Sequence, residues 1–418
     1  MRLCADGNSE ETSAPRPLAA LFFVLGLAVL AAGCAGRPYG DLIVGAGAPD
    51  ASKVDLLVVT TRAPVIEPPG VMFGGARARG LEFADITVSI PPDDKRKAGD
   101  VQWPSSPPGD PERDFVTLRA DRLQLAQARA EFDRRVARTP GRKVLVFVHG
   151  YNTRFEEAVY RFAQIVHDAH VDVVPILFTW PSGGKLVDYV YDRDSAVYSR
   201  DALEALLQAL AKDPSVASIS ILSHSMGNFV TVEALRQMAI RDRGLPSKIK
   251  DVMAASPDID VDVFRREIAE IDSFPRTTTF TLFVSRDDRA LGLSSFLARD
   301  TTRLGALDPT KEPYRSILEQ AKVHVIDLTN YTSNDFTNHG KFATGEVVMA
   351  IGDRLAEGQT LTDSRQGLVE SLGTFTHGAI DVAADAVTAP TRIVDPTINE
   401  KSEDVGGYSP AELRAVQP

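Results

Sequence analysis

The chain has 418 residues, of which 44% are hydrophobic, and it carries a formal net charge of -11 at pH 7. A chain of this length can bury a substantial core, and about 300 ordered residues in one α/β domain would be ordinary. Binding to a nucleic acid backbone needs clustered positive charge, so the acidic balance and the lack of a basic stripe in the sequence argue against a nucleic acid partner.

An apolar run at residues 18–32 is followed by Gly33 and Cys34. Its fifteen residues are short for a membrane span, which needs about 20. Small residues directly before a cysteine resemble a bacterial lipoprotein signal, so we expect a signal peptide at residues 1–33, a lipidated Cys34 and a linker at residues 34–50. The residue after the cysteine is Ala35 rather than an aspartate, which resembles lipoproteins that are sent to the outer membrane. The sequence therefore predicts a lipid-anchored envelope protein in the outer membrane, facing the periplasm. The segment before the run is poorly basic, and this leaves an uncleaved span or a peripheral anchor open.

Residues 51–357 alternate strand-like and helical patterns, which predicts an α/β fold with a mostly parallel, doubly wound sheet flanked by helices. Residues 51–140 are expected to extend the sheet, with strands at 56–60, 86–90 and 115–118 and a charged helix at 122–138. Residues 141–357 form the expected catalytic core, with strands at 144–148, 173–179, 217–222, 251–255, 279–284 and 322–327. Residues 358–418 turn to small and polar side chains and are expected to be a partly disordered tail or a peripheral helix at 366–387. In such a sheet the active site forms at the carboxyl ends of the strands.

The strand at 144–148 runs into His149, Gly150 and Tyr151. Glycine lets the backbone turn close to a bound carbonyl group. We therefore expect the backbone N–H of Tyr151 to be one donor of an oxyanion hole, with His149 and Gly150 in the supporting turn. The alternative is an ordinary tight turn in which the imidazole of His149 bonds to backbone.

The pentapeptide SHSMG at residues 223–227 lies between a predicted strand and a helical pattern, which is the layout of a nucleophile elbow with Ser225 at its tip. Such a corner directs the N–H of Met226 at the group that the serine attacks, and Gly227 supports the turn. Ser223 stands where the usual pattern has glycine. The alternative is a serine that merely caps a helix.

Two adjacent carboxylates, Asp287 and Asp288, follow the strand at 279–284. We select Asp288 as the acid that orients the base, because the apolar residues 290–291 predict that the chain turns inward just after it. Asp287 stands beside an arginine and resembles a solvated charge. Asp258 and Asp260 are the fallback acids, although capping of the following helix is an alternative role for them.

His339 lies in a polar loop after the last strand and is the expected general base. A serine hydroxyl needs a neutral imidazole to take its proton, and a carboxylate holds that imidazole in the right tautomer. His324 alternates with apolar neighbours and is expected within the sheet, while His377 lies in a different kind of segment near the end of the chain.

No metal or organic cofactor is expected. His167 and His170 could share one face of a helix, but no cysteine or carboxylate cluster in the sequence completes a metal site around them. Cysteine occurs only at positions 4 and 34, so the body of the protein has neither a disulfide nor a cysteine nucleophile.

Several short motifs resemble those of bacterial α/β-hydrolase-fold proteins of the esterase/lipase superfamily, whose natural substrates are mostly undefined. The motifs are TTRAP at 60–64, FVHGYN at 147–152, FTWPS at 178–182, SHSMG at 223–227, PDID at 257–260, DRAL at 288–291 and RLG at 303–305. The resemblance implies that Ser225, Asp288 and His339 occupy the triad positions, and that Tyr151 and Met226 occupy the oxyanion positions.

These patterns predict a serine hydrolase that cleaves carboxylic esters, from small molecules or lipids, through an acyl-enzyme. Residues 180–198 and 291–304 contain aromatic and leucine side chains that could line an apolar acyl pocket. An amidase, peptidase or thioesterase with the same triad is an alternative. A second alternative is a non-catalytic envelope binding or scaffold protein on a hydrolase fold. The sequence does not predict the oligomeric state.

Overall fold

The computed structural model describes residues 39–333, 335–356 and 379–380. The expected signal peptide, Cys34, His377 and most of the expected tail lie outside the described residues. From residue 39 onward the expected linker packs along the body of the protein, because Leu42 is buried and the N–H of Gly45 donates to the carbonyl of Thr117 at 2.9 Å.

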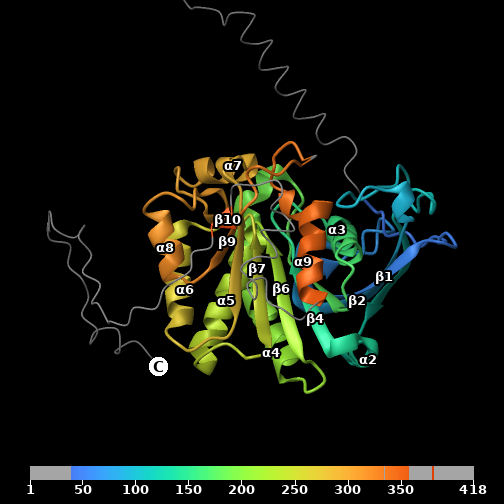
Figure 1. The fold of residues 1–418 in the computed structure, drawn as a ribbon. Coiled ribbons are helices and arrows are strands. Elements are labelled where there is room, and N and C mark those ends of the chain that lie inside the picture. Colours follow the sequence, from blue (N-terminus) through green and yellow to red (C-terminus); the bar gives the residue numbers. More distant parts are fainter. Residues whose placement is uncertain (1–38, 334, 357–378, 381–418) are drawn as a thin grey trace, which may run out of the picture. The chain divides into compact units, whose positions relative to one another are not determined.

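The strands and helices alternate along most of the chain (Figure 1). The strands are β1 (Ser52–Pro64), β2 (Phe73–Ile90), β3 (Val116–Leu123), β4 (Lys143–Val148), β5 (Val174–Thr179), β6 (Ser218–His224), β7 (Ile249–Ala255), β8 (Thr279–Val284), β9 (His324–Asp327) and β10 (Ala379–Ile380). The helices are α2 (Leu125–Arg138), α3 (Phe155–Asp168), α4 (Tyr189–Lys212), α5 (Met226–Asp242), α6 (Val261–Asp272), α7 (Arg289–Leu297), α8 (Tyr314–Gln320) and α9 (Gly345–Ala356). Short 3-10 turns include Leu186–Asp188 and Lys341–Ala343.

The strands form one sheet in the order β10-β9-β8-β7-β6-β4-β5-β1-β2-β3. The strands from β9 to β1 in this order are parallel. The antiparallel pairs are β10 with β9, β2 with β1, and β3 with β2. This arrangement confirms the predicted mostly parallel sheet. All the parallel strands end at the same edge, so the loops that follow them meet there.

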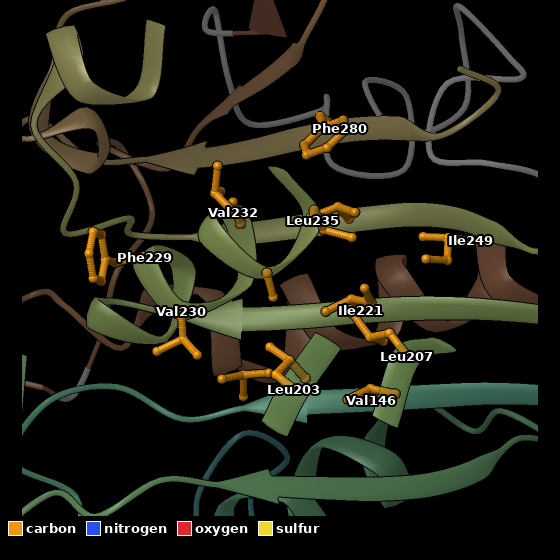
Figure 2. Packing of buried hydrophobic residues seen from close by; sticks show 14 of the residues in the cluster. Val146, Leu203, Leu207, Ile221, Phe229, Val230, Val232, Leu235, Ile249 and Phe280 are labelled. Atoms are coloured by element: carbon orange, nitrogen blue, oxygen red, sulfur yellow. The ribbon is translucent and has the colours of Figure 1, made fainter. Parts of the chain in front are cut away.

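Helices cover both faces of the sheet, and each central strand therefore carries apolar side chains on both sides. Val146 of β4 points to the face covered by α4 and α5, whereas Phe147 points to the face covered by α3 and α9. Figure 2 shows Leu203 and Leu207 of α4 beside Val146 and Ile221. Burying one such leucine side chain stabilises the fold by about 1.5–3 kcal/mol.

The largest differences from the sequence prediction concern β2 and β10. Strand β2 begins at Phe73, well before the predicted 86–90. Its first half was not predicted because it reads GGARARG, and glycine is uncommon in strands. Residues 379–380 form the short strand β10 against β9, within the segment expected to be a partly disordered tail or a peripheral helix at 366–387. Among the described residues, none of the helices combines the length and apolar character that a bilayer crossing requires.

Candidate active site

Ser225 lies at the corner between β6 and α5 in a strained backbone conformation. Its φ is 53° and its ψ is -125°, a region that residues other than glycine rarely adopt. Such a conformation costs about 1–3 kcal/mol and is characteristic of functional sites. The Ser225 side chain makes no capping hydrogen bond to α5, which a serine with a merely capping role would make.

Two glycines allow this corner to pack tightly. A Cβ atom on Gly227 would lie 2.4 Å from the carbonyl oxygen of His149. A Cβ atom on Gly150 would lie 2.7 Å from the Cβ atom of Ser225. Both positions therefore require glycine, and the loop after β4 packs directly against the Ser225 corner.

Ser223, the departure from the usual elbow pattern, fits through a specific hydrogen bond. Its hydroxyl donates to the side-chain oxygen of Asn228 at 2.6 Å. The Asn228 amide in turn donates to the carbonyls of Ser225 and Ala255 at 3.1 and 2.9 Å. The added hydroxyl thus belongs to a buried network that braces the corner, and Asn228 was not predicted as part of it.

Asp288 and His339 are brought together by the loops after β8 and β9. Nδ1 of His339 lies 2.7 Å from Oδ2 of Asp288, whose other oxygen accepts from the N–H of Leu291 at 3.0 Å. Burial lowers the pKa of His339, but the hydrogen bond and charge of Asp288 outweigh burial, so the pKa lies above its usual 6.5. Asp288 therefore fixes the ring so that Nδ1 carries a proton and Nε2 is left to accept one.

Asp287 points elsewhere and has a different role. Its carboxylate forms an ion pair with the buried Lys341, at 2.7 Å, and accepts from the amide of Asn338 at 2.9 Å. The expectation of a solvated charge is thus only half right, because the side chain is 43% exposed but paired. The pair ties the loop after β8 to the His339 loop.

The main chain of His339 is held from both sides by residues that sequence reasoning missed. Oδ2 of Asp335 accepts from the N–H of His339 at 2.9 Å and from that of Gly340 at 3.0 Å. The carbonyl of His339 lies 3.2 Å from Nε2 of His224 and accepts from the hydroxyl of Ser256 at 3.3 Å. Because a carbonyl can only accept, Nε2 of His224 carries the proton.

His339 adjoins the Ser225 corner through His224, the residue before the serine. The two imidazole centroids are 4.5 Å apart. Burial and the neighbouring His339 hold the pKa of His224 well below its ordinary value, so His224 stays neutral. Among the described residues, neither Oγ of Ser225 nor Nε2 of His339 has a protein hydrogen-bond partner, which leaves both atoms available for chemistry.

The expected oxyanion donors lie on either side of this corner. Met226 is the first residue of α5, and the first N–H groups of a helix have no partner within the helix. Tyr151 lies in the loop after β4, where its ring packs edge-on against Tyr189, with centroids 5.3 Å apart. The next residue, Asn152, has a φ of 54° and donates its N–H to Asp192 at 3.1 Å, which fixes the loop.

The imidazole of His149 has the backbone-bonded role that was considered as the alternative. Its Nδ1 lies 2.9 Å from the carbonyl of Gly150, and its Nε2 accepts from the N–H of Trp180 at 3.1 Å. Burial and the charge of Arg62 hold the pKa of His149 well below its ordinary value. His149 is therefore a neutral, buried support of the turn.

Arg62 is a buried cation that contacts the same loop, and no role was predicted for it from the sequence. It is 1% exposed and donates to the carbonyls of Thr153, Ser182 and Gly74 at 2.7, 2.9 and 3.0 Å. The available signal was an arginine shortly after the apolar residues 56–59 of the strand, since a buried charge needs dedicated partners.

The remaining candidates have structural surroundings. Asp258 is buried against Arg303, with 3.3 Å between Oδ1 and Nε, and it accepts from Ser294 at 2.5 Å. Asp260 caps α6, as its alternative role predicted. His324 lies in β9.

His167 and His170 have surroundings other than those of a metal site. His167 lies 3.0 Å from Asp93, and the rings of the two histidines are 6.0 Å apart. Within the part of the chain that the structure describes, no group of three or more histidine, cysteine or carboxylate side chains is placed to hold a metal ion.

A cavity of about 1,100 Å³ opens beside the His339 loop. His339, His224 and Gly150 contribute to its wall, together with Trp103, Arg161 and other residues of the 97–103 loop, α3 and α9. The cavity mixes polar and apolar groups and is large enough for a small organic substrate.

The doubly wound sheet and the serine corner define an α/β hydrolase. Residues 124–356, more than half of the chain, match the family described as "Alpha/beta hydrolase of unknown function (DUF900)". The chain belongs to this family, and the resemblance inferred from the motifs is confirmed at the level of the α/β-hydrolase fold.

The chain also has more distant similarities. The chain is 24% identical over 120 residues to an uncharacterized protein of Nostoc sp., a match that covers 23% of this chain and 31% of that protein. A lipase-esterase related protein of Clostridium acetobutylicum is similar in structure at 11% identity, over 51% of this chain and 93% of that one, with a TM-score of 0.29. An esterase of Pyrococcus furiosus is similar at 11% identity, over 75% and 95%, with a TM-score of 0.32.

Proposed function

We propose that this α/β hydrolase is a serine hydrolase that cleaves carboxylic esters through an acyl-enzyme. The observation that carries the proposal is the 2.7 Å contact between Asp288 and His339 beside the strained corner that holds Ser225. A carboxylate, an imidazole and a serine in these places have the roles of orienting acid, base and nucleophile. No metal or cofactor is needed for this chemistry.

In the proposed reaction, Nε2 of His339 takes the Ser225 proton as Oγ attacks the ester carbonyl. The tetrahedral oxyanion accepts hydrogen bonds from the N–H groups of Met226 and Tyr151. His339 then gives its proton to the departing alcohol, and water repeats the sequence on the acyl-enzyme. Asp288 stabilises the imidazolium that forms in each half-reaction.

Hydrolysis of a panel of soluble esters, thioesters and anilides by wild type and Ser225→Ala tests this function. We expect ester turnover by wild type and a loss of roughly 10³-fold or more in the variant, because the serine acts as a unit with its base. Circular dichroism serves as the control for folding. Activity of Ser225→Ala close to wild type would contradict the mechanism, and faster cleavage of anilides than of esters would assign an amidase instead.

We also propose that Cys34 is lipidated and anchors the protein in the cell envelope. Small residues followed by a cysteine after the apolar run at 18–32 support this proposal. Cys34→Ser should move the protein from the membrane fraction to the soluble fraction. Continued membrane association would indicate a retained apolar span instead.

A further inference from the structure

Seven large, solvent-exposed apolar side chains lie along the edge of the sheet at which the candidate active site is found. They are between 53% and 86% exposed and form what we call the apolar rim: Leu186, Val187, Val190, Leu293, Phe296, Leu297 and Phe336. Only eleven large apolar side chains among the described residues are more than half exposed, so the rim holds most of them. Exposed apolar groups that cluster in this way mark an interaction surface.

The rim comes from three segments that contact one another. The start of α4 meets α7 where the hydroxyl of Tyr189 lies 2.9 Å from that of Ser294. The start of α7 meets the Phe336 loop where the N–H of Arg289 donates to Thr337 at 2.9 Å, and the Arg289 guanidinium covers the Phe336 ring at 4.7 Å. Each segment follows a strand end of the parallel sheet, and α7 lies at the top of Figure 1.

The rim also adjoins the proposed catalytic groups. The hydroxyl of Tyr151, whose N–H is a proposed oxyanion donor, donates to the carbonyl of Leu186. Asp288, which contacts His339, is the N-cap residue of α7. A surface that covered the rim would therefore lie next to the segments that carry these groups.

The described chain begins at this same edge. The guanidinium of Arg154 covers the ring of Tyr39 at 5.4 Å, and the N–H of Gly40 donates to Glu156 at 3.2 Å, both at the start of α3. Cγ of Arg154 lies 2.7 Å from where a Cβ atom on Gly184 would stand, two residues before Leu186.

The amino-terminal sequence limits how far this edge can lie from a membrane. The apolar run at 18–32 and Cys34 come shortly before Tyr39. Five residues of fully extended chain span at most roughly 17 Å. Whether the attachment is a lipid on Cys34 or the apolar run itself, it lies close to the edge that carries the rim.

The charged side chains around the rim are mixed in sign. The exposed Lys185, Arg289 and Arg299 stand among the exposed Asp194 and Asp300. The edge therefore has no strongly basic character, and the surface that it fits is apolar rather than anionic.

We propose that the apolar rim docks onto a lipid bilayer to which the amino-terminal segment tethers the chain, so that the active site faces the bilayer and takes its ester from the lipid phase. The docking itself rests on the exposed rim and the tether. Only the second part, the source of the ester, rests on the proposed function.

Labelling of a cysteine introduced at a chosen position of the full-length chain tests the docking. The parent carries Cys4→Ser and Ser225→Ala, so that catalysis plays no part and any signal from Cys34 is measured as background. An environment-sensitive fluorophore is placed with Val187→Cys, Phe296→Cys or, as the matched control, Ile240→Cys. Ile240 lies about 21 Å along α5 from the Ser225 end, since a helix rises about 1.5 Å per residue.

The labelled chains are reconstituted in phosphatidylcholine vesicles that contain a lipid brominated on its acyl chains as quencher. We expect strong quenching at positions 187 and 296, none at 240, and no change when anionic lipid is added. Unquenched labels at 187 and 296 would overturn the proposal. So would a stable dimer in solution, measured by light scattering, that buries the same labels without vesicles.

Activity variants in the catalytically intact chain separate the two proposals. Val187→Asp should lower hydrolysis of a vesicle-borne ester by about tenfold or more while leaving a soluble short ester unaffected, and Ile240→Asp should change neither. Equal loss on both substrates would contradict delivery from the lipid phase. If wild type hydrolysed no ester in either form while labels 187 and 296 were quenched, docking would stand and the proposed esterase function would fail.

Discussion

Two adjacent aspartates have different roles because the chain places their side chains in different surroundings. Asp288 is buried, caps α7 and contacts the imidazole of His339. Asp287, one residue earlier, is partly exposed and pairs with Lys341. The apolar residues after the pair favoured Asp288 as the acid, and in the structure Asp288 is the one that contacts His339. The partner of Asp287 lies 54 positions away and could not be predicted from local sequence.

Asp288→Asn should reduce ester turnover by roughly 10³-fold or more, because asparagine no longer holds the productive tautomer or stabilises the imidazolium. Asp287→Asn should cost less than about tenfold, since Lys341 keeps other oxygen acceptors, including the carbonyls of Leu328 and Thr329. Steady-state kinetics of the two variants provide the comparison. If Asp287→Asn were the more damaging change, the acid would be reassigned.

The raised pKa of His339 predicts the pH dependence of catalysis. Only the neutral imidazole accepts the serine proton, so kcat/KM should rise with pH and reach half its maximum above 6.5. In Asp288→Asn the largest influence that raises the pKa of His339 is removed, while burial, which lowers that pKa, remains. The residual activity of that variant should therefore persist to lower pH than in wild type. An acid limb that does not move would argue against the pairing as the cause.

At the scale of elements, the loops that carry the site are held by buried charges. Asp192 of α4 accepts from Ser182 at 2.5 Å and from the N–H groups of Gly183 and Asn152 at 2.7 and 3.1 Å. Asp192 thus joins the loop after β5 to the loop after β4, and Arg62 donates hydrogen bonds to a carbonyl of each of these loops. Sequence patterns place such loops at the strand ends, but they do not reveal which distant charge holds each loop.

Glu267 of α6 lies near Glu233 of α5, which should make the stability of the fold depend on pH. Glu267 is buried on α6, and burial together with the neighbouring Glu233 raises its pKa to about 8. Between pH 4.5 and about pH 8, Glu267 therefore keeps its proton in the folded protein, whereas in the unfolded chain, with its ordinary pKa of 4.5, it has released it. Stability should fall as pH rises between these two values.

Glu267→Gln should remove this pH dependence, since glutamine is uncharged throughout. Thermal unfolding at pH 5 and at pH 8.5 is the measurement. We expect the variant to gain stability relative to wild type at the higher pH and to gain little at the lower. A constant difference between the two proteins at both values would show that Glu267 is not protonated in the folded state.

At the scale of the whole molecule, the alternation of strands and helices was sufficient to predict the parallel sheet and the edge at which the site lies. The order of Ser225, Asp288 and His339 along the chain predicted which loops would meet there. The supports Arg62, Asn228 and Asp335 were not predicted, because their importance depends on contacts made only in the folded chain. The exposure of the apolar rim was not predicted either, because apolar residues in a sequence usually indicate core.

The central claim is that Ser225 is an activated nucleophile, and labelling of the full-length protein with a fluorophosphonate probe tests it most directly. Such probes react with serines that an adjacent base activates. We expect wild type to be modified at Ser225, as identified by mass spectrometry, and Ser225→Ala to remain unlabelled. A folded wild-type protein that does not label, or one that labels equally in the variant, would contradict the account.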